Sequence, residues 1–409
     1  MPRRRSHGLN GRSPHTNLVL GPLAALALAA IAGCQAGPTD NGCQITKQVV
    51  IPGTTPLALL SEISVVRVGG TTVLLGSDTT SVRWVTIAQD GTVGTEQSAA
   101  LPPDTLRAFY ALAGVDSPGD RVVIGVLVAN GSDADLRLMV APTDDGAAAG
   151  APGPAIATFG GGVSTPGQVA MGTSVSSMYA GVAWIDGLNP TYAFVDGQGA
   201  VVGTPAVIEN ALGSGYSCLG FAPGKQELTV TYKREPTDPV LGPIWLIADL
   251  QVGGAIDTLS LSVAQVGGKM SCAQTVLYDD NGSREYAIVW QDRSGSWLSV
   301  YYGPGGGGVD SYGFASSTIF GGADLQPPLM GLATFLGKDF GVLFAKPHSV
   351  ELWRTDWVGN LRSGALVFPS LQGDVRNIAS VSSTNLLTST YADYTGSEGR
   401  RLVIDASCY

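Results

Sequence analysis

Short runs of alternating apolar and polar residues recur along the chain and are separated by turns rich in glycine. They are enriched in Val, Thr, Tyr and Trp, as in TTVLLGSD, which ends at Asp78, and EYAIVWQD, which ends at Asp292. Alternation of this kind, bounded by turn residues, predicts β-strands. No segment of helical length shows the periodicity of an amphipathic helix. The pattern therefore predicts an all-β protein.

A strand, a glycine-containing turn and a second strand recur at a nearly constant interval. The turn glycines are separated by 52 to 55 residues and are Gly91, Gly146, Gly199, Gly254, Gly306 and Gly359. Two further β-rich runs precede the turn, such as ISVVRVG and TTVLLGSD in the first unit. Each unit thus offers four strands, which we name A, B, C and D in chain order, with the glycine turn between C and D.

Four-stranded units at this period are typical of a β-propeller. Residues 34–409 have room for seven units, and the seventh has its C strand in RRLVIDASCY, residues 400–409. A spare β-rich run, CQITKQVVIP, begins at Cys43 and can supply the missing D strand. We expect a seven-bladed β-propeller over residues 43–409, with its ring closed by pairing of the N-terminal and C-terminal strands, which removes an unpaired edge. The alternative is a tandem array of small β-domains.

Residues 1–33 have the parts of a bacterial export signal. Four arginines and no acidic residue precede an apolar stretch, LVLGPLAALALAAIA, and then Gly33 and Cys34. The stretch is shorter than the roughly 20 residues of a transmembrane helix. The sequence Ile31-Ala32-Gly33-Cys34 resembles the bacterial lipobox. This resemblance implies that Cys34 is lipidated and becomes the mature N-terminus, and we expect a flexible tether over residues 34–42. The alternative is an ordinary signal peptide.

The residue after the lipidated cysteine bears on localisation. In lipoproteins, an acidic residue at this place tends to keep the protein at the inner membrane, whereas here it is Gln35. The resemblance therefore implies the outer membrane. The stretch WQDRSGSWLSVYYGPGG, from Trp290, also resembles a repeat of secreted bacterial propeller lipoproteins, which supports the fold and indicates no ligand. We expect a cell-envelope protein whose lipid makes the membrane its partner.

Composition excludes one class of partner. Residues 1–33 hold four of the 23 basic residues, so the mature chain has 19 basic and 33 acidic residues and a net charge of −14. No cluster of Lys and Arg occurs outside the leader, whereas nucleic-acid binding requires a basic surface. We therefore exclude nucleic acid as a partner.

Four cysteines follow Cys34, and an even number in an oxidising compartment favours disulfides. Cys43 and Cys408 belong to the two strands that would complete the seventh unit, and their repeat phase places them opposite each other. Cys218 and Cys272 lie 54 residues apart, about one repeat, and would start neighbouring innermost strands. We expect the bridges Cys43–Cys408 and Cys218–Cys272.

Aspartates end the predicted B strands of several units, namely Asp78, Asp186, Asp292 and Asp393. They could ring the mouth of the propeller channel as a cation or sugar site. A simpler interpretation is that each side chain bonds its own backbone and closes the turn between B and C. Repetition favours this second interpretation, because a functional site seldom needs the same acid in every unit.

Three further features of the sequence could indicate a calcium, metal or sugar site, and each has a simpler explanation. Oxygen-bearing residues alternate in YDDNGSREY, but its glycine is not at the place a Ca²⁺ loop requires, and an Asn-Gly hairpin turn explains the run. His348, the only histidine of the mature chain, lies in a predicted B–C loop, so one chain cannot supply a two-histidine metal site. The seven tryptophans could stack on sugars, but their recurrence at equivalent strand positions favours packing.

These observations favour a non-catalytic scaffold that binds a protein or glycan on one propeller face. We predict no catalytic residue, metal or cofactor. The first alternative is a carbohydrate-active propeller, a hydrolase or lyase, which would need two carboxylates about 5–10 Å apart in a cleft. The second is a subunit of an envelope assembly complex, by analogy with other propeller lipoproteins.

Overall fold

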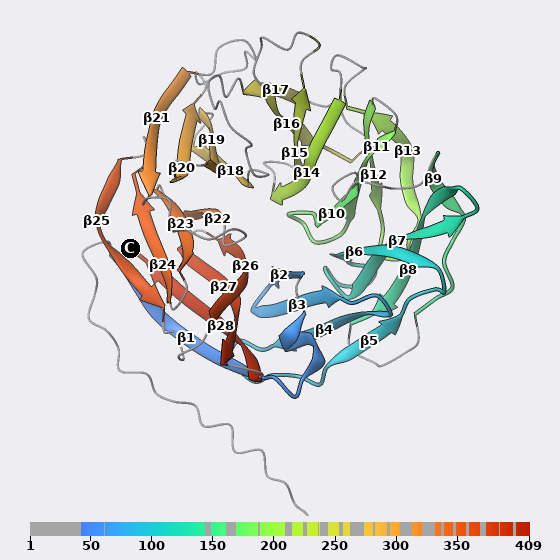
Figure 1. Ribbon diagram of the computed structural model, residues 1–409, viewed down its shortest axis with the longest axis horizontal. Coiled ribbons are helices and arrows are strands. Elements are labelled where there is room, and N and C mark those ends of the chain that lie inside the picture. The colour runs from blue at the N-terminus through green and yellow to red at the C-terminus, as the bar shows by residue number, and fades with distance from the viewer. Residues whose placement is uncertain are drawn as a thin grey trace, which may run out of the picture. The chain divides into compact units, whose positions relative to one another are not determined.

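The computed structural model describes the chain from Gly42 to Tyr409 with internal gaps (Figure 1). The described residues are 42–60, 62–143, 149–160, 169–186, 189–208, 215–223, 227–235, 237, 244–252, 257–261, 274–280, 283–292, 295–302, 313–320, 332–336, 339–346, 349–356, 360–368, 374–383, 385–395 and 398–409. The predicted leader and tether, including Cys34, lie outside them except for Gly42.

The described residues form four-stranded antiparallel sheets, which confirms the prediction of four-stranded β units. The first sheet contains β2 (Ile63–Val68), β3 (Thr71–Ser77), β4 (Ser81–Ile87) and β5 (Gln97–Ala100). The second contains β6 (Thr105–Ala113), β7 (Arg121–Asn130), β8 (Asp133–Pro142) and β9 (Ala155–Phe159). The third contains β10 (Val169–Thr173), β11 (Ala180–Asp186), β12 (Asn189–Val195) and β13 (Val201–Val207). The fourth contains β14 (Gly215–Pro223), β15 (Leu228–Glu235), β16 (Ile244–Leu250) and β17 (Asp257–Leu261). The fifth contains β18 (Gln274–Asp280), β19 (Ser283–Asp292), β20 (Gly295–Tyr302) and β21 (Gly313–Phe320). The sixth contains β22 (Leu332–Leu336), β23 (Asp339–Lys346), β24 (Ser349–Thr355) and β25 (Leu361–Phe368).

One further sheet, the terminal sheet, combines the two ends of the described chain. It contains β26 (Asp374–Ser383), β27 (Leu386–Thr395), β28 (Glu398–Cys408) and β1 (Cys43–Pro52), in that order. In Figure 1 the blue β1 accordingly lies beside the red β28. Their register runs from Cys43 opposite Cys408 to Pro52 opposite Arg400. The D strand that the sequence placed in CQITKQVVIP is thus the partner of β28.

The repeat phase is visible in the turns between C and D strands. The amide of Ala88 donates to the carbonyl of Thr92 at 2.9 Å, and the same four-residue bond joins Asp196 to Ala200 and Asp356 to Asn360. Gly91 and Gly199 take φ values of 89° and 80° in these turns, a conformation that favours glycine. Three of the described turns between C and D strands therefore share one backbone hydrogen bond at the repeat phase.

Buried apolar clusters join successive sheets instead of filling each sheet separately. One cluster joins the first and second sheets around Trp84, and another joins the second and third around Trp184. The terminal sheet contributes to two clusters, one shared with the sixth sheet and one with the first. Its A strand, β26, also contacts both β22 and β2. Shared cores of this kind argue against a tandem array of independent β-domains.

Candidate functional site

The crossover between β1 and β2, described over residues 53–60 and 62, contacts the terminal, first and second sheets. It contains the short 3-10 helix η1 (Pro56–Leu59), whose Leu57 and Ala58 are fully buried. A Cβ atom on Gly53 would lie 1.8 Å from the carbonyl oxygen of Gly399 on β28. Only glycine therefore allows the crossover to pass this close to the terminal sheet.

Arg401 on β28 is a buried cation that binds main-chain carbonyl groups. Its guanidinium donates to Ala58 at 3.3 Å and to Leu60 at 3.0 Å, both in the crossover. A third bond, at 3.4 Å, reaches Asn377 on β26. Burial lowers the pKa of Arg401 to about 10, so the side chain remains charged at neutral pH. Arg401 thereby fastens the crossover to the terminal sheet.

Carboxylates of the first sheet hold the crossover from the other side. Glu96 accepts a hydrogen bond from the amide of Leu57 at 3.0 Å. It also pairs with Arg83 at 2.9 Å, and Arg83 in turn pairs with Asp78 at 3.3 Å. A continuous polar chain therefore runs from Asp78 through Arg83 and Glu96 to the crossover.

Asp78 closes its own turn, as the simpler interpretation of the strand-end acids expects. Its Oδ1 accepts from the amides of Thr80 at 2.7 Å and Ser81 at 2.8 Å. Burial alone would raise the pKa of Asp78, but hydrogen bonds from Thr80, Ser81 and Arg83 outweigh it and hold that pKa well below its ordinary value. A carboxylate that stays ionised at neutral pH is poorly suited to donate a proton there.

The other three predicted strand-end acids differ from Asp78 in their place in the strand or in what is described of them. The expectation that Asp393 ends its strand is wrong, because the β27–β28 ladder continues to the pair Thr395 and Glu398. Asp393 is 1% exposed and forms an ion pair with Arg400 at 3.3 Å. Asp186 and Asp292 are the last residues of β11 and β19, and their side chains lie outside the described part of the structure.

Two tyrosines complete the contacts of the crossover. Tyr394 donates to the carbonyl of Leu59 and Tyr110 to the carbonyl of Glu62, each at 3.0 Å. Burial raises the pKa of Tyr110, which keeps its hydroxyl protonated and able to donate. Arg107 on β6 pairs with the Glu62 side chain at 3.2 Å. The crossover thus joins the terminal, first and second sheets.

A second polar cluster lies between the terminal and first sheets. Asp405 on β28 is 4% exposed and pairs with Lys47 on β1 at 2.8 Å. It also accepts from the Thr388 hydroxyl at 2.7 Å. Arg67 on β2 lies 3.7 Å from the Asp405 carboxylate and donates to Thr388 at 3.2 Å. This cluster joins β28 to both β1 and β2.

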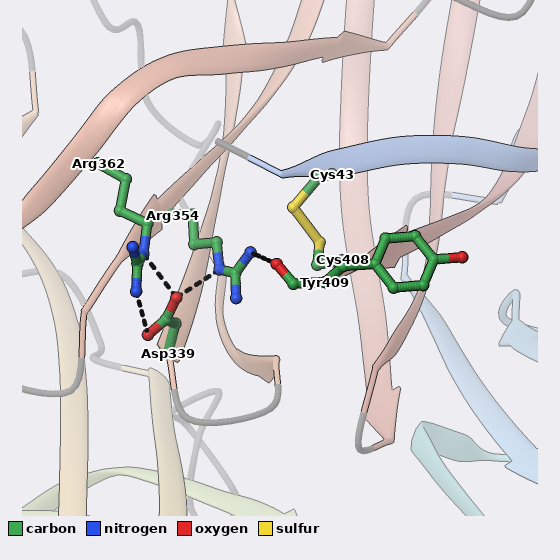
Figure 2. Close-up of a disulfide and its surroundings, with 6 residues drawn as sticks. All are labelled: Cys43, Asp339, Arg354, Arg362, Cys408 and Tyr409. Atoms are coloured by element: carbon green, nitrogen blue, oxygen red, sulfur yellow. Dashed lines mark hydrogen bonds and ion pairs between the residues drawn. A yellow bond between two sulfur atoms is a disulfide. The ribbon is translucent and has the colours of Figure 1, made fainter. Parts of the chain in front are cut away.

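The disulfide Cys43–Cys408 is present, as the sequence predicted, with 4.0 Å between the two Cα atoms. The next residue, Tyr409, donates from its amide to the carbonyl of Gly42 at 3.0 Å. Figure 2 shows Arg354 between Tyr409 and Asp339: it donates to the Tyr409 carbonyl at 2.7 Å and pairs with Asp339. Arg362 pairs with the same carboxylate at 2.7 Å. We call the six residues drawn in Figure 2 the clasp, namely Cys43, Cys408, Tyr409, Arg354, Asp339 and Arg362.

Several sequence predictions lie outside the described residues. They include lipidation at Cys34, the Cys218–Cys272 bridge, since Cys272 is not described, and the exposure of His348. In YDDNGSREY, β18 and β19 pair with Asp280 opposite Ser283, which supports a two-residue hairpin connection. Trp84 is 1% exposed and donates to the carbonyl of Thr143 at 2.9 Å, which supports packing over sugar stacking.

The polar side chains described above bind backbone groups of the crossover and join neighbouring sheets. No group of three or more His, Cys, Asp and Glu side chains suited to a metal ion occurs among the described residues. In the same part of the chain, no helix is long and apolar enough to span a membrane. Sequence reasoning missed Glu96 and Arg401. Neither residue belongs to a repeated pattern or a motif that marks it in the sequence.

No known protein family matches this sequence, and no curated protein is similar to it. Among solved structures, the polysaccharide lyase Uly1 is 10% identical with a TM-score of 0.53, covering 86% of this chain and 90% of its own. The β-propeller domain of Nup133 from Vanderwaltozyma polyspora is 7% identical with a TM-score of 0.50, covering 90% of this chain and 100% of its own. At identities this low the likeness concerns the fold alone, and that fold is a β-propeller.

Proposed function

We propose that this chain is a lipid-anchored protein of the bacterial cell envelope whose propeller is a non-catalytic binding scaffold. Its ligand is a protein or a glycan held on one propeller face. The proposal rests above all on the use of polar groups around the crossover. Asp78, Glu96 and Arg401 all bind backbone groups, and Asp78 and Glu96 also pair with Arg83, so they stiffen loops instead of facing a substrate.

The scaffold is a seven-bladed ring closed by β1. Two observations support this closure. The terminal sheet shares one apolar cluster with the sixth sheet and another with the first. Its β26 contacts the A strands of both neighbours, β22 and β2. An experimental map of residues 43–409 with any other number of blades would contradict this part of the proposal.

The lipid anchor at Cys34 follows from the lipobox resemblance, and Gln35 favours the outer membrane. The test is fractionation of cells that produce the full chain, its Cys34→Ala variant and a Gln35→Asp variant. We expect Cys34→Ala to lose membrane association while its propeller stays folded. We expect Gln35→Asp to move to the inner membrane. Membrane association of Cys34→Ala at the level of the natural chain would refute lipidation.

Binding and turnover can be separated with residues 43–409 alone. Soluble envelope glycans and peptides are tested for binding by titration calorimetry. The same glycans are assayed for new reducing ends and for the unsaturated ends that a lyase forms. We expect saturable binding without product. Sustained product formation would instead establish a carbohydrate-active enzyme.

A further inference from the structure

The chain enters the propeller at the position of the disulfide. Cys43 is the first residue of β1 and is bonded to Cys408, and Gly42 just before it accepts a hydrogen bond from the Tyr409 amide. Cys34 lies nine residues before Cys43 in the sequence. Fully extended, that segment spans at most about 30 Å. Any pull between the membrane and a ligand on the propeller would therefore reach Cys43 first.

Without the disulfide, β1 is the strand most easily removed by such a pull. It is an edge strand that pairs only with β28, and its register begins at the Cys43 end. Tension applied there would open the β1–β28 hydrogen bonds one pair after another, since each pair is loaded only when the previous pair has opened. The disulfide lies at the first pair and moves the load from β1 to β28, which has a partner on both sides.

The clasp carries the load one sheet further. The carbonyl of Tyr409, adjacent to Cys408, is held by Arg354 of β24 at 2.7 Å (Figure 2). Arg354 is 8% exposed and shares the 3%-exposed Asp339 with Arg362 of β25. Charge-assisted bonds that are shielded from water are stronger than exposed ones. The end of β28 is therefore fixed to the sixth sheet as well as to β1.

We propose that the clasp is a mechanical junction, which prevents tension on the N-terminal tether from peeling β1 off the propeller. The inference rests on the proposed lipid anchor for its biological role. Its physical content concerns residues 42–409 and is testable without any lipid. Failure of Cys34 lipidation and failure of the junction are therefore separate results.

The test is single-molecule pulling on a chain that starts at residue 34, with one handle there and another at the exposed Ser132 in the β7–β8 turn. Release of β1 and the crossover would lengthen the chain by at most about 70 Å, the extended length of roughly 20 residues at about 3.5 Å each, less the distance that the folded segment already spans. We expect no such step before global unfolding in the oxidised protein. In Cys43→Ser/Cys408→Ser we expect this step at a force below that of global unfolding. The natural chain after reduction should show the same step, and it serves as a second sample if the variant folds poorly.

Arg354→Met tests the second part of the junction. With the disulfide intact, we expect this variant to lower the force at which the terminal sheet opens, because Tyr409 loses its attachment to the sixth sheet. Arg137→Met is the matched control, since it removes an ion pair with the buried Asp135 of the second sheet, which contacts neither Tyr409 nor the crossover. Two results would overturn the proposal. One is that β1 is not released before global unfolding in either Cys43→Ser/Cys408→Ser or the reduced natural chain. The other is that both arginine variants lower the opening force of the terminal sheet equally.

Discussion

Alternate residues of β28 face opposite neighbours, and the two sets differ in chemistry. Leu402, Ile404, Ala406 and Cys408 belong to the apolar cluster shared with the sixth sheet. The residues between them include Val403, which belongs to the cluster shared with the first sheet, and two buried charges, Arg401 and Asp405. One face of the same strand therefore packs almost entirely through hydrocarbon, whereas the other buries a cation and a carboxylate.

The corresponding pairs in the first and sixth sheets are apolar. Asp405 pairs with Thr388, whereas the pairs at this repeat phase are Leu75 with Trp84 in the first sheet and Leu343 with Leu352 in the sixth. In those sheets a covalent turn joins the C and D strands and fixes their register, but β1 has no such turn. Apolar contacts tolerate a shifted strand better than a buried ion pair does. We infer that the charged face selects the position of β1, and that the apolar face supplies most of the burial energy.

The largest effect should come from removing the covalent link on the apolar face. The disulfide joins residues separated by 365 positions. In the chain-entropy model, closing a loop of this length in the unfolded state stabilises the folded protein by about 6 kcal/mol, as an upper figure. We expect Cys43→Ser/Cys408→Ser to lower the melting temperature and to increase hydrogen exchange in β1 and β28, with the other sheets still protected. Ser407→Ala is the control, and an unchanged melting temperature would contradict the prediction.

Arg401 should rank next, because its loss leaves buried carbonyls without their donor. Each such group costs about 1–3 kcal/mol, so Arg401→Met should reduce the free energy of unfolding by about 4 kcal/mol in urea titration. Hydrogen exchange should rise in residues 53–62, which Arg401 fastens. Arg401→Lys keeps the charge and should recover part of the loss. Normal protection of the crossover in Arg401→Met would show that Glu96 and the tyrosines suffice.

Asp405 tests the charged face more selectively. Asp405→Leu leaves Lys47 and Arg67 without their carboxylate and should cost about 3 kcal/mol. Adding Lys47→Met should recover part of that loss, because an apolar pair then replaces the Lys47–Asp405 ion pair, although Arg67 still lacks its carboxylate. We nevertheless expect the double variant to regain the Cys43–Cys408 bridge less efficiently on oxidative refolding, because β1 has lost its register signal. Leu352→Met, at the corresponding apolar position, should cost less than about 1.5 kcal/mol and refold normally.

Features of this fold that repeat along the chain could be predicted from the sequence, whereas contacts that occur only once could not. The strands, the turn glycines and the pairing of Cys43 with Cys408 follow from a repeat whose period is visible in the sequence. Arg401 and Glu96 could not be assigned in this way, because their partners are backbone groups of a crossover that occurs once. Asp393 was misplaced because the ladder beyond it depends on the pairing of Thr395 with Glu398, which no periodic pattern specifies.

The smallest effect should arise at Asp78, which reaches the crossover only through Arg83 and Glu96. Its side chain is about a third exposed, so solvent screening limits its contribution to about 1 kcal/mol. Its folded-state pKa lies below the ordinary value of 3.8, so its stabilisation is present above that pH and is lost as the pH falls towards the lowered pKa. Asp78→Asn should therefore be less stable than the natural chain at pH 7, by urea titration, and the difference should shrink below about pH 4. Asp104→Asn, at an exposed position, is the control and should leave the free energy of unfolding nearly unchanged. A difference for Asp78→Asn that stays constant into acid would show that the carboxylate charge does not hold this turn.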